Sequence, residues 1–208
     1  MATTDKLHWL GHDAFRIDGP PVVYIDPYQL GEGLPAGDVV LITHDHFDHL
    51  SLSDLARVSA KGTVIVAPRE VAAKVSEPVR TIAPGETLTV KGAKVRAVPA
   101  YNTNKTFHPK ADGKVGFVVT LGGVTYYHAG DTDAIPEMTG LAPDVALLPV
   151  SGTYVMTAEE AAEAARAIRP KVAVPMHYGA IVGSDADAHR FARLLEGSGI
   201  EVVIKDKE

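Results

Sequence analysis

Cysteine is missing from this 208-residue sequence. The chain can therefore form neither a disulfide nor a thiolate–metal bond, so any metal ion must be bound through nitrogen and oxygen atoms. Long apolar segments are missing too, since no run approaches the ~18 residues of a membrane-crossing helix. The first residues also lack the apolar core of a signal peptide. We therefore expect a cytoplasmic protein with no membrane partner.

Basic residues are fewer than acidic ones. The sequence has 26 acidic residues against 20 lysines and arginines, which gives a net charge of −6. This balance provides no overall attraction to nucleic-acid backbones or anionic membranes. We expect a small-molecule substrate and no nucleic-acid partner, and we leave a homo-oligomer open. The length and the 46% hydrophobic content indicate one well-packed domain over residues 1–208.

The most informative stretch is Thr43-His44-Asp45-His46-Phe47-Asp48-His49, which follows the apolar run 39–42. In an extended backbone His44 and His46 project to the same side and can chelate one ion. Asp48 and His49 lie on the turn just beyond, where they can reach a second ion. Imidazole and carboxylate ligands suit zinc, manganese, iron or nickel. A solvated histidine-rich loop is the alternative, but such a loop seldom follows an apolar strand directly.

The pattern of apolar and turn residues predicts a mixture of strands and helices. Helices are expected after Ser51, where a cap is present, over 69–75, from Thr157 to Ile168 and over 185–195. Clustered strands favour antiparallel pairing, whereas strands separated by helices favour parallel pairing. Two mixed sheets facing each other accommodate both patterns. Strands are expected over 7–10, 14–18, 22–26, 39–42, 63–67, 87–91, 94–100, 115–121, 124–128, 144–150, 171–176 and 201–205.

The histidine-rich stretch resembles the His-x-His-x-Asp-His signature of the metallo-β-lactamase-fold hydrolases. Other sequence elements typical of that superfamily occur before and after this stretch, in the order that the superfamily uses, and they cover essentially the whole chain. They are Gly11-His12, Ile25-Asp26-Pro27, His128-Ala129-Gly130-Asp131-Thr132 and Pro175-Met176-His177-Tyr178-Gly179. The sequence is similar to the small stand-alone branch that contains L-ascorbate-6-phosphate lactonase. The resemblance implies an α/β fold, a four-layer αββα sandwich of two mixed β-sheets flanked by helices.

The resemblance also implies a set of ligands for one or two divalent transition metal ions. We expect zinc first, with manganese, nickel or iron as alternatives. The ligands divide between the ions as follows: His44 and His46 on the first, Asp48, His49 and His177 on the second, and Asp131 as a bridge.

Three further residues are expected to support this site without binding metal. Asp26 ends an apolar strand, where a carboxylate needs partners, and we expect it to orient a ligand histidine. His128 is expected to hydrogen-bond within the pocket. The resemblance places His12 on a loop beside the metals, although a histidine on a surface turn fits the sequence equally well.

The expected chemistry is hydrolysis. Two metal ions ~3.5 to 4 Å apart lower the pKa of a shared water and polarise a substrate oxygen. The resulting hydroxide would attack a carbonyl or phosphoryl centre while Asp48 orients it and takes its proton. His108, Tyr154 and Tyr178 are the candidates for contacts with the substrate or leaving group. The branch that the sequence resembles implies a phosphodiester or a (phosphorylated) lactone or ester as substrate.

One position departs from the family pattern. Many relatives have a histidine shortly after the strand equivalent to 94–100, where this sequence has Tyr101-Asn102. His108 is favoured as the replacement ligand, while Asn102 and a loosely held first ion stay open. The polar segment 101–114 also contains Lys105 and Lys110, which are either solvated or available to a substrate phosphate.

Two other function classes stay open. Some proteins of this fold carry out redox chemistry at iron, usually with a flavin-binding domain for which 208 residues leave no room. A metal-binding or scaffold protein without turnover is the second class, and the nearly complete ligand set argues against it. Metal analysis and a generic ester such as bis-p-nitrophenyl phosphate distinguish these classes from a hydrolase.

Overall fold

The computed structural model describes residues 3–208, and its first sheet has six strands. The first three strands form an antiparallel meander, and the last three join in parallel, so the sheet is mixed as expected. Parallel pairing requires long connections, which here are the loop 26–38 between β3 and β4 and the segments that contain the helices between β4 and β5 and between β5 and β6. In spatial order the strands are β1 (Leu7–Gly11), β2 (Ala14–Ile17), β3 (Val23–Ile25), β4 (Val39–Leu41), β5 (Val64–Ala67) and β6 (Val79–Thr81).

The second sheet has seven strands and is also mixed. Its first four strands pair antiparallel, including the hairpin at Gly122-Gly123, and the remainder are parallel. The strands follow one another across the sheet: β7 (Thr87–Val90), β8 (Ala93–Pro99), β9 (Val115–Leu121), β10 (Val124–His128), β11 (Val145–Pro149), β12 (Val172–Met176) and β13 (Glu201–Val202).

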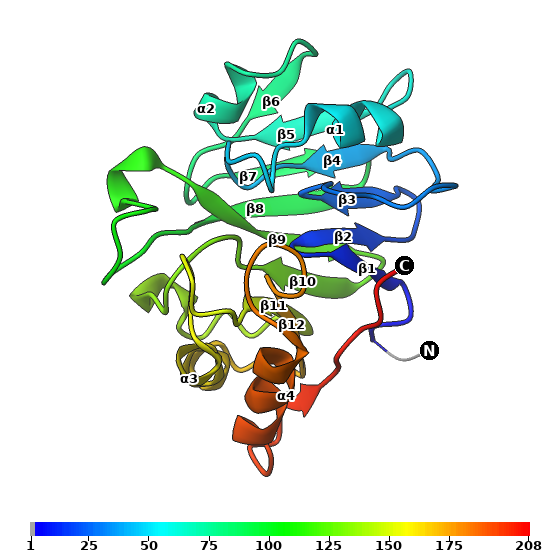
Figure 1. Cartoon of the computed structure of the whole chain (residues 1–208). Coiled ribbons are helices and arrows are strands. Elements are labelled where there is room, and N and C mark those ends of the chain that lie inside the picture. Colours follow the sequence, from blue (N-terminus) through cyan, green and yellow to red (C-terminus); the bar gives the residue numbers. More distant parts are fainter. Residues whose placement is uncertain (1–2) are drawn as a thin grey trace.

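Helices cover the outer side of each sheet (Figure 1). On the first sheet lie α1 (Leu52–Val58), capped by the Ser51 side chain, and the short α2 (Arg69–Ala72). On the second sheet lie α3 (Ala158–Ile168) and α4 (Asp185–Leu194). The α3 helix begins with the expected capping box of Thr157 and Glu160. The four-layer αββα sandwich is therefore confirmed.

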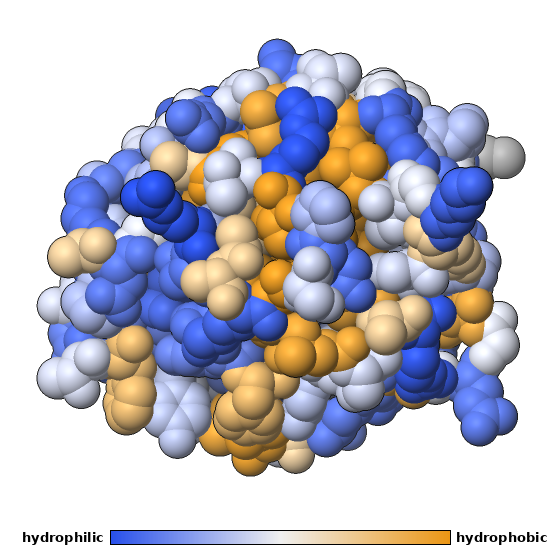
Figure 2. Space-filling view, turned by 90° about the horizontal axis from the view of Figure 1, so that it is seen from above, coloured by the Kyte–Doolittle hydropathy of each residue, from blue (hydrophilic) through white to orange (hydrophobic). Residues whose placement is uncertain are grey.

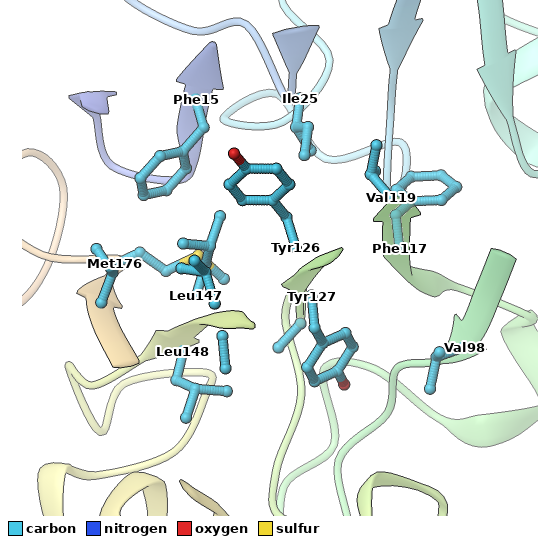
Figure 3. Packing of buried hydrophobic residues seen from close by; sticks show 14 of the residues in the cluster. Phe15, Ile25, Val98, Phe117, Val119, Tyr126, Tyr127, Leu147, Leu148 and Met176 are labelled. Carbon is cyan, nitrogen blue, oxygen red and sulfur yellow. The ribbon is translucent and has the colours of Figure 1, made fainter. Parts of the chain in front are cut away.

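The core lies between the two sheets. Figure 3 shows Tyr126 of β10 pointing toward Phe15 and Ile25 of the first sheet, whereas its neighbour Tyr127 points the opposite way, toward Leu148. This alternation is the period of two that a strand buried on both faces requires. A second cluster of buried apolar residues fills the space between the first sheet and helices α1 and α2.

Element boundaries differ from the sequence expectation in three places. The strand β6 has no clear apolar alternation, and it is held as an edge strand by β5. The last strand β13 covers two residues, not 201–205, and α2 ends at Ala72. Within residues 3–208 no helix combines the length and apolarity needed to cross a membrane. Figure 2 shows a band of apolar side chains flanked by hydrophilic ones on the face viewed from above.

Two short 3₁₀ helices complete the chain: Lys110–Asp112 and Pro136–Met138. The first lies in the long loop between β8 and β9. That loop, together with the loops after β4, β10, β11 and β12, borders one end of the sandwich, where the functional residues gather.

Candidate metal centre

Parallel strands deliver the polar side chains to one place. His44 follows β4, Asp131 follows β10 and His177 follows β12, each just past the carboxyl end of its strand. Side chains at such ends emerge where the sheet stops and the backbone turns, so they can converge from distant parts of the chain. Gly130 helps to place Asp131, because its φ of +65° and the Val115 carbonyl oxygen, 3.0 Å from any added Cβ, leave no room for a side chain.

The first group of candidate ligands unites four side chains. One ligand atom from each lies within 4.8 Å of those of the others. The His108 Nε2 atom is 3.3 Å from the His46 Nδ1 atom, so the loop between β8 and β9 folds back as expected. The members are His44, His46, His108 and Asp131.

The second group differs from the expected one. His49 and His177 are joined by two neighbours on the turn between β1 and β2, and the four ligand atoms again lie within 4.8 Å of one another. The Asp13 Oδ2 atom is 3.7 Å from His49 Nε2 and 3.8 Å from His177 Nε2. The members are His12, Asp13, His49 and His177.

Asp131 lies between the two groups. Its Oδ1 atom is 3.2 Å from His49 Nε2 and 3.3 Å from His177 Nε2. Its Oδ2 atom is 3.4 Å from His108 Nε2 and 3.9 Å from His44 Nε2. Each carboxylate oxygen thus faces one group, which is the arrangement expected of a bridging ligand.

Four of the histidines are oriented in the same way. The His49 Nδ1–H group donates to Asp26 at 2.8 Å, and that of His44 donates to the Thr43 hydroxyl at 3.0 Å. The corresponding acceptors are the Ser151 hydroxyl for His177 and the Asn102 side-chain oxygen for His108, both at 2.9 Å. Partners on Nδ1 fix the tautomer that leaves Nε2 free for a metal ion.

Several side-chain atoms that these contacts leave free are buried and, within residues 3–208, make no well-aligned hydrogen bond, although some of them lie close to one another across the site. They include the Nε2 atoms of three histidines and carboxylate oxygens of two aspartates. Unpaired buried polar atoms cost free energy unless a ligand satisfies them. Their convergence on two points fits a pair of cations, and the donor set of nitrogen and oxygen fits divalent transition metals. In the two groups the atoms are Nδ1 of His12, Nε2 of His44, His49 and His177, both oxygens of Asp13, and Oδ1 of Asp131.

The electrostatics of the metal-free site follow from the same geometry. Burial holds the pKa of His44 well below its usual value and lowers that of His108 to about 4. Burial also acts against protonation of His177, but the carboxylates of Asp131 and Asp13 outweigh it and raise the pKa to about 9. In return, His177 and its neighbours hold the pKa of Asp131 well below the ordinary range despite its burial.

Strained backbone accompanies several of these positions. His12, Asp26, Tyr154 and His177 all have φ between +46° and +68°. Residues other than glycine seldom adopt this region, and each instance costs about 1–3 kcal/mol. The His12 carbonyl oxygen accepts hydrogen bonds from the Trp9 indole at 2.9 Å and from the His177 N–H at 3.1 Å, which fixes both strained turns against each other.

The contacts of four residues differ from those considered in the sequence analysis. His12, expected to support the site without binding metal, joins the second group, and Asp48 Oδ2 lies 3.9 Å from His49 Nε2. Asp48, expected on the second ion, belongs to neither group, and its Oδ2 atom accepts a hydrogen bond from His12 Nε2 at 3.1 Å. Tyr178 is buried beneath the site, where its ring stacks on Trp9 with centroids 4.8 Å apart, so it does not line the cleft. The Asn102 side-chain oxygen accepts a hydrogen bond from His108 Nδ1, and its NH₂ group donates to the Tyr154 carbonyl oxygen, so Asn102 orients His108.

Asp26 and His128, also expected to support the site, form hydrogen bonds of the expected kind. Asp26 accepts hydrogen bonds from His49 and from both the backbone and the hydroxyl of Thr43. His128 donates from Nε2 to the Asp13 carbonyl oxygen at 2.9 Å and so holds the turn that bears the second group.

Sequence reasoning missed Asp13 and Ser151. An aspartate on a turn is ordinary, and only the contact between that turn and the end of β12 makes Asp13 a candidate ligand. A signal for Ser151 was present, since it begins a small-residue loop after β11, but its partner His177 lies 26 positions away.

A cleft of about 610 Å³ opens beside the first group, whereas the members of the second group lie buried behind it. Asp48, His46, His108 and Asp131 contribute to its floor and walls, and Tyr154 lies on its rim. A small molecule in this cleft can therefore reach the first group and Asp131, and the cleft volume is in the range of ligand sites.

Comparison with known proteins agrees with this geometry. Residues 6–177 match the family model described as "Beta-lactamase superfamily domain". A UPF0173 metal-dependent hydrolase of Pyrococcus horikoshii is 38% identical over 96% of this chain and 95% of its own length. One of Methanoculleus marisnigri is also 38% identical, over 92% of this chain and 88% of its own length.

Solved structures extend the comparison. A Parabacteroides distasonis protein described as a metal-dependent hydrolase aligns with a TM-score of 0.88 and 33% identity over 97% of this chain and 93% of its own. The metallo hydrolase Igni18 of Ignicoccus hospitalis aligns with a TM-score of 0.80 and 28% identity over 97% and 95% of the two chains. The chain therefore belongs to the metallo-β-lactamase superfamily and, within it, to the UPF0173 family of metal-dependent hydrolases.

Proposed function

We propose that this protein hydrolyses an ester bond of a small molecule, either a phosphodiester or a lactone or ester, at two divalent transition metal ions. The observation that carries the proposal is the position of Asp131. One of its oxygens faces His49 and His177, and the other faces His44 and His108. A carboxylate shared in this way is suited to hold two ions at the short separation that hydrolytic pairs use.

The two groups of side chains divide the ions between them under this proposal. When bound, such ions polarise a substrate oxygen and lower the pKa of water. Zinc is the first choice because nitrogen ligands predominate, and manganese, nickel and iron are the alternatives. The proposed ligands are His44, His46 and His108 for one ion, His12, Asp13, His49 and His177 for the other, and Asp131 for both.

Asp48 is proposed as the proton acceptor. Burial works to raise the pKa of its carboxyl group, but the hydrogen bond from His12 and the neighbouring His49 lower it below the ordinary value. The side chain is therefore an ionised carboxylate at neutral pH, and it faces the cleft. It can accept the proton of an attacking water, while the Tyr154 hydroxyl on the rim can donate to the leaving group.

Chelation and reloading test this proposal. Protein stripped of metal and reloaded with zinc, manganese, nickel or iron is assayed on bis-p-nitrophenyl phosphate and on a γ-lactone. We expect turnover only after reloading, and the faster substrate identifies the ester class. Asp48→Asn is expected to reduce turnover by about 10²–10⁴, the scale of a positioned base, while two ions stay bound. Full activity in a rigorously metal-free preparation would refute the mechanism.

A further inference from the structure

The rim of the cleft exposes apolar side chains to an unusual degree. Six large apolar side chains in residues 3–208 are exposed, and four of them line this one cleft. Burying such groups is favourable, so a cluster of them that stays exposed to water is typical of a binding site. The four are Phe47 at 67%, Phe107 at 51%, Ile181 at 41% and Tyr154 at 38% exposure.

These side chains come from four separate segments. Phe47 belongs to the loop after β4, Phe107 to the loop between β8 and β9, Tyr154 to the loop before α3 and Ile181 to the loop before α4. Phe107 and Tyr154 pack edge to face with ring centroids 4.5 Å apart. The apolar rim therefore encircles the opening directly above His46, His108 and Asp131.

Positive charge around the cleft is already neutralised. Lys74 and Lys114 both contact Asp45, at 2.5 and 3.3 Å, and Lys114 also lies 3.9 Å from Asp112. Lys105 contacts Asp133 at 2.5 Å. Lys110 pairs with Glu137 at 2.7 Å. Lys105 and Lys110, which the sequence offered as phosphate partners, are thus occupied by carboxylates of this chain.

From these two observations we infer the substrate class: an ester or lactone whose acyl or alkyl portion is an uncharged, apolar group that lies against Phe47, Phe107, Tyr154 and Ile181. This inference rests on the proposed hydrolysis for the position of the reacting bond. The apolar group would extend outward from the metal site across the rim, where it buries surface that water otherwise covers.

Two series of compounds of increasing chain length test the inference, one by its binding and the other by its turnover. Straight-chain hydroxamic acids of four to ten carbons are titrated into the zinc-loaded protein, and p-nitrophenyl esters of matching length are assayed. We expect the affinity and kcat/KM to rise about threefold to fourfold per methylene until the rim is covered. Phe107→Ser and Ile181→Ser are expected to flatten both trends, whereas Leu52→Ser, which removes an apolar side chain 54% exposed outside the cleft, leaves them unchanged.

Different results overturn different conclusions. Length-dependent binding without turnover of any ester would refute the proposed hydrolysis and leave the apolar specificity standing. Turnover that is independent of chain length would refute the specificity alone. A phosphorylated ester bound tenfold more tightly than its uncharged counterpart, with the difference lost in Lys74→Gln, would also refute it. A further result would refute the specificity: the protein self-associates at assay concentrations, and Phe107→Ser abolishes this association but leaves the chain-length trend unchanged. The apolar rim would then serve contact between copies of the chain.

Discussion

At the scale of single residues, Asp13 carries the most unexpected role. Its carboxylate is fully buried, has no hydrogen-bond partner and lies under His49 and His177. Asp48, which the sequence motif favours for the same ion, instead pairs with His12 at the cleft wall. Under the proposed mechanism Asp13 would bind the second ion and Asp48 would accept the proton, two roles that the sequence suggested for Asp48 alone.

We predict that Asp13→Asn weakens binding of the second metal ion by at least ~10- to 100-fold, the loss that follows removal of even a supporting partner. Asp48→Asn, the matched control, is expected to keep metal affinity within about tenfold because its carboxylate lies outside both groups. Isothermal titration calorimetry with zinc measures the metal affinity of both variants. If Asp48→Asn weakened zinc binding more than Asp13→Asn does, Asp48 would be a metal ligand.

The pair of Asn102 and His108 is the second case at this scale. Asn102→Ala removes the acceptor that orients the His108 ring, so we predict about 10–100-fold weaker binding of the first ion. His108→Ala removes the nitrogen itself and is predicted to weaken binding further. Asn104→Ala is the control, because that exposed side chain forms hydrogen bonds with Glu160 and Lys105, outside the metal groups. Wild-type affinity in both Asn102→Ala and His108→Ala would place His108 outside the metal site.

Metal binding is predicted to release protons at neutral pH. The pKa of His177 is raised to about 9 in the metal-free protein, and that of His49 is also raised, so both imidazoles hold a proton that a metal ion must displace. Affinity is therefore expected to increase with pH and to level off as the pH passes about 9. Titrations in buffers of different ionisation enthalpy count the protons. No release at pH 7 would contradict the raised pKa values.

At the scale of the secondary-structure elements, the β9–β10 pair positions Asp131, the proposed bridging ligand. A Cβ atom on Gly116 would lie 2.5 Å from the Ala129 carbonyl oxygen and 2.6 Å from that of His128. These are backbone atoms at the end of β10, immediately before Asp131, so an added methyl group has to displace the segment that bears the ligand.

We predict that Gly116→Ala lowers the free energy of unfolding by about 1–3 kcal/mol or more and weakens metal binding at the same time. Gly31→Ala is the control, since its nearest neighbour would be 3.8 Å away and its φ is not positive. Urea denaturation and zinc titration of both variants provide the two readouts. Loss of stability with unchanged metal affinity would show that the strand end does not position Asp131.

At the scale of the whole molecule, the metal site joins the two sheets. His44 and Asp26 follow strands of the first sheet, whereas Asp131 and His177 follow strands of the second. Any cation bound among them cross-links the two layers of the core. It also neutralises carboxylates that are otherwise buried without partners.

Chelation is therefore predicted to destabilise the fold. A ligand at a thousand times its dissociation constant stabilises a protein by about 4 kcal/mol, which for a domain of this size corresponds to roughly 8–15 °C in Tm. Thermal denaturation of zinc-loaded protein before and after EDTA measures the difference. The His46→Ala, Asp131→Asn double variant, which loses one ligand of the first ion and the shared carboxylate, should show a smaller effect of EDTA. A Tm insensitive to EDTA in the wild-type chain would contradict the cross-link.

The sequence by itself determined the layers of this protein and the core of its metal site. Apolar periodicity and caps act locally, so they predicted most strands, the α3 helix and the delivery of His44, His46 and His49 by β4. Contacts across the fold were decided only by tertiary structure. The turn between β1 and β2 inserts Asp13 beneath His49, Asn102 orients His108, and acidic partners occupy Lys105 and Lys110. Such pairs are set by packing between distant segments, which no local pattern of residues records.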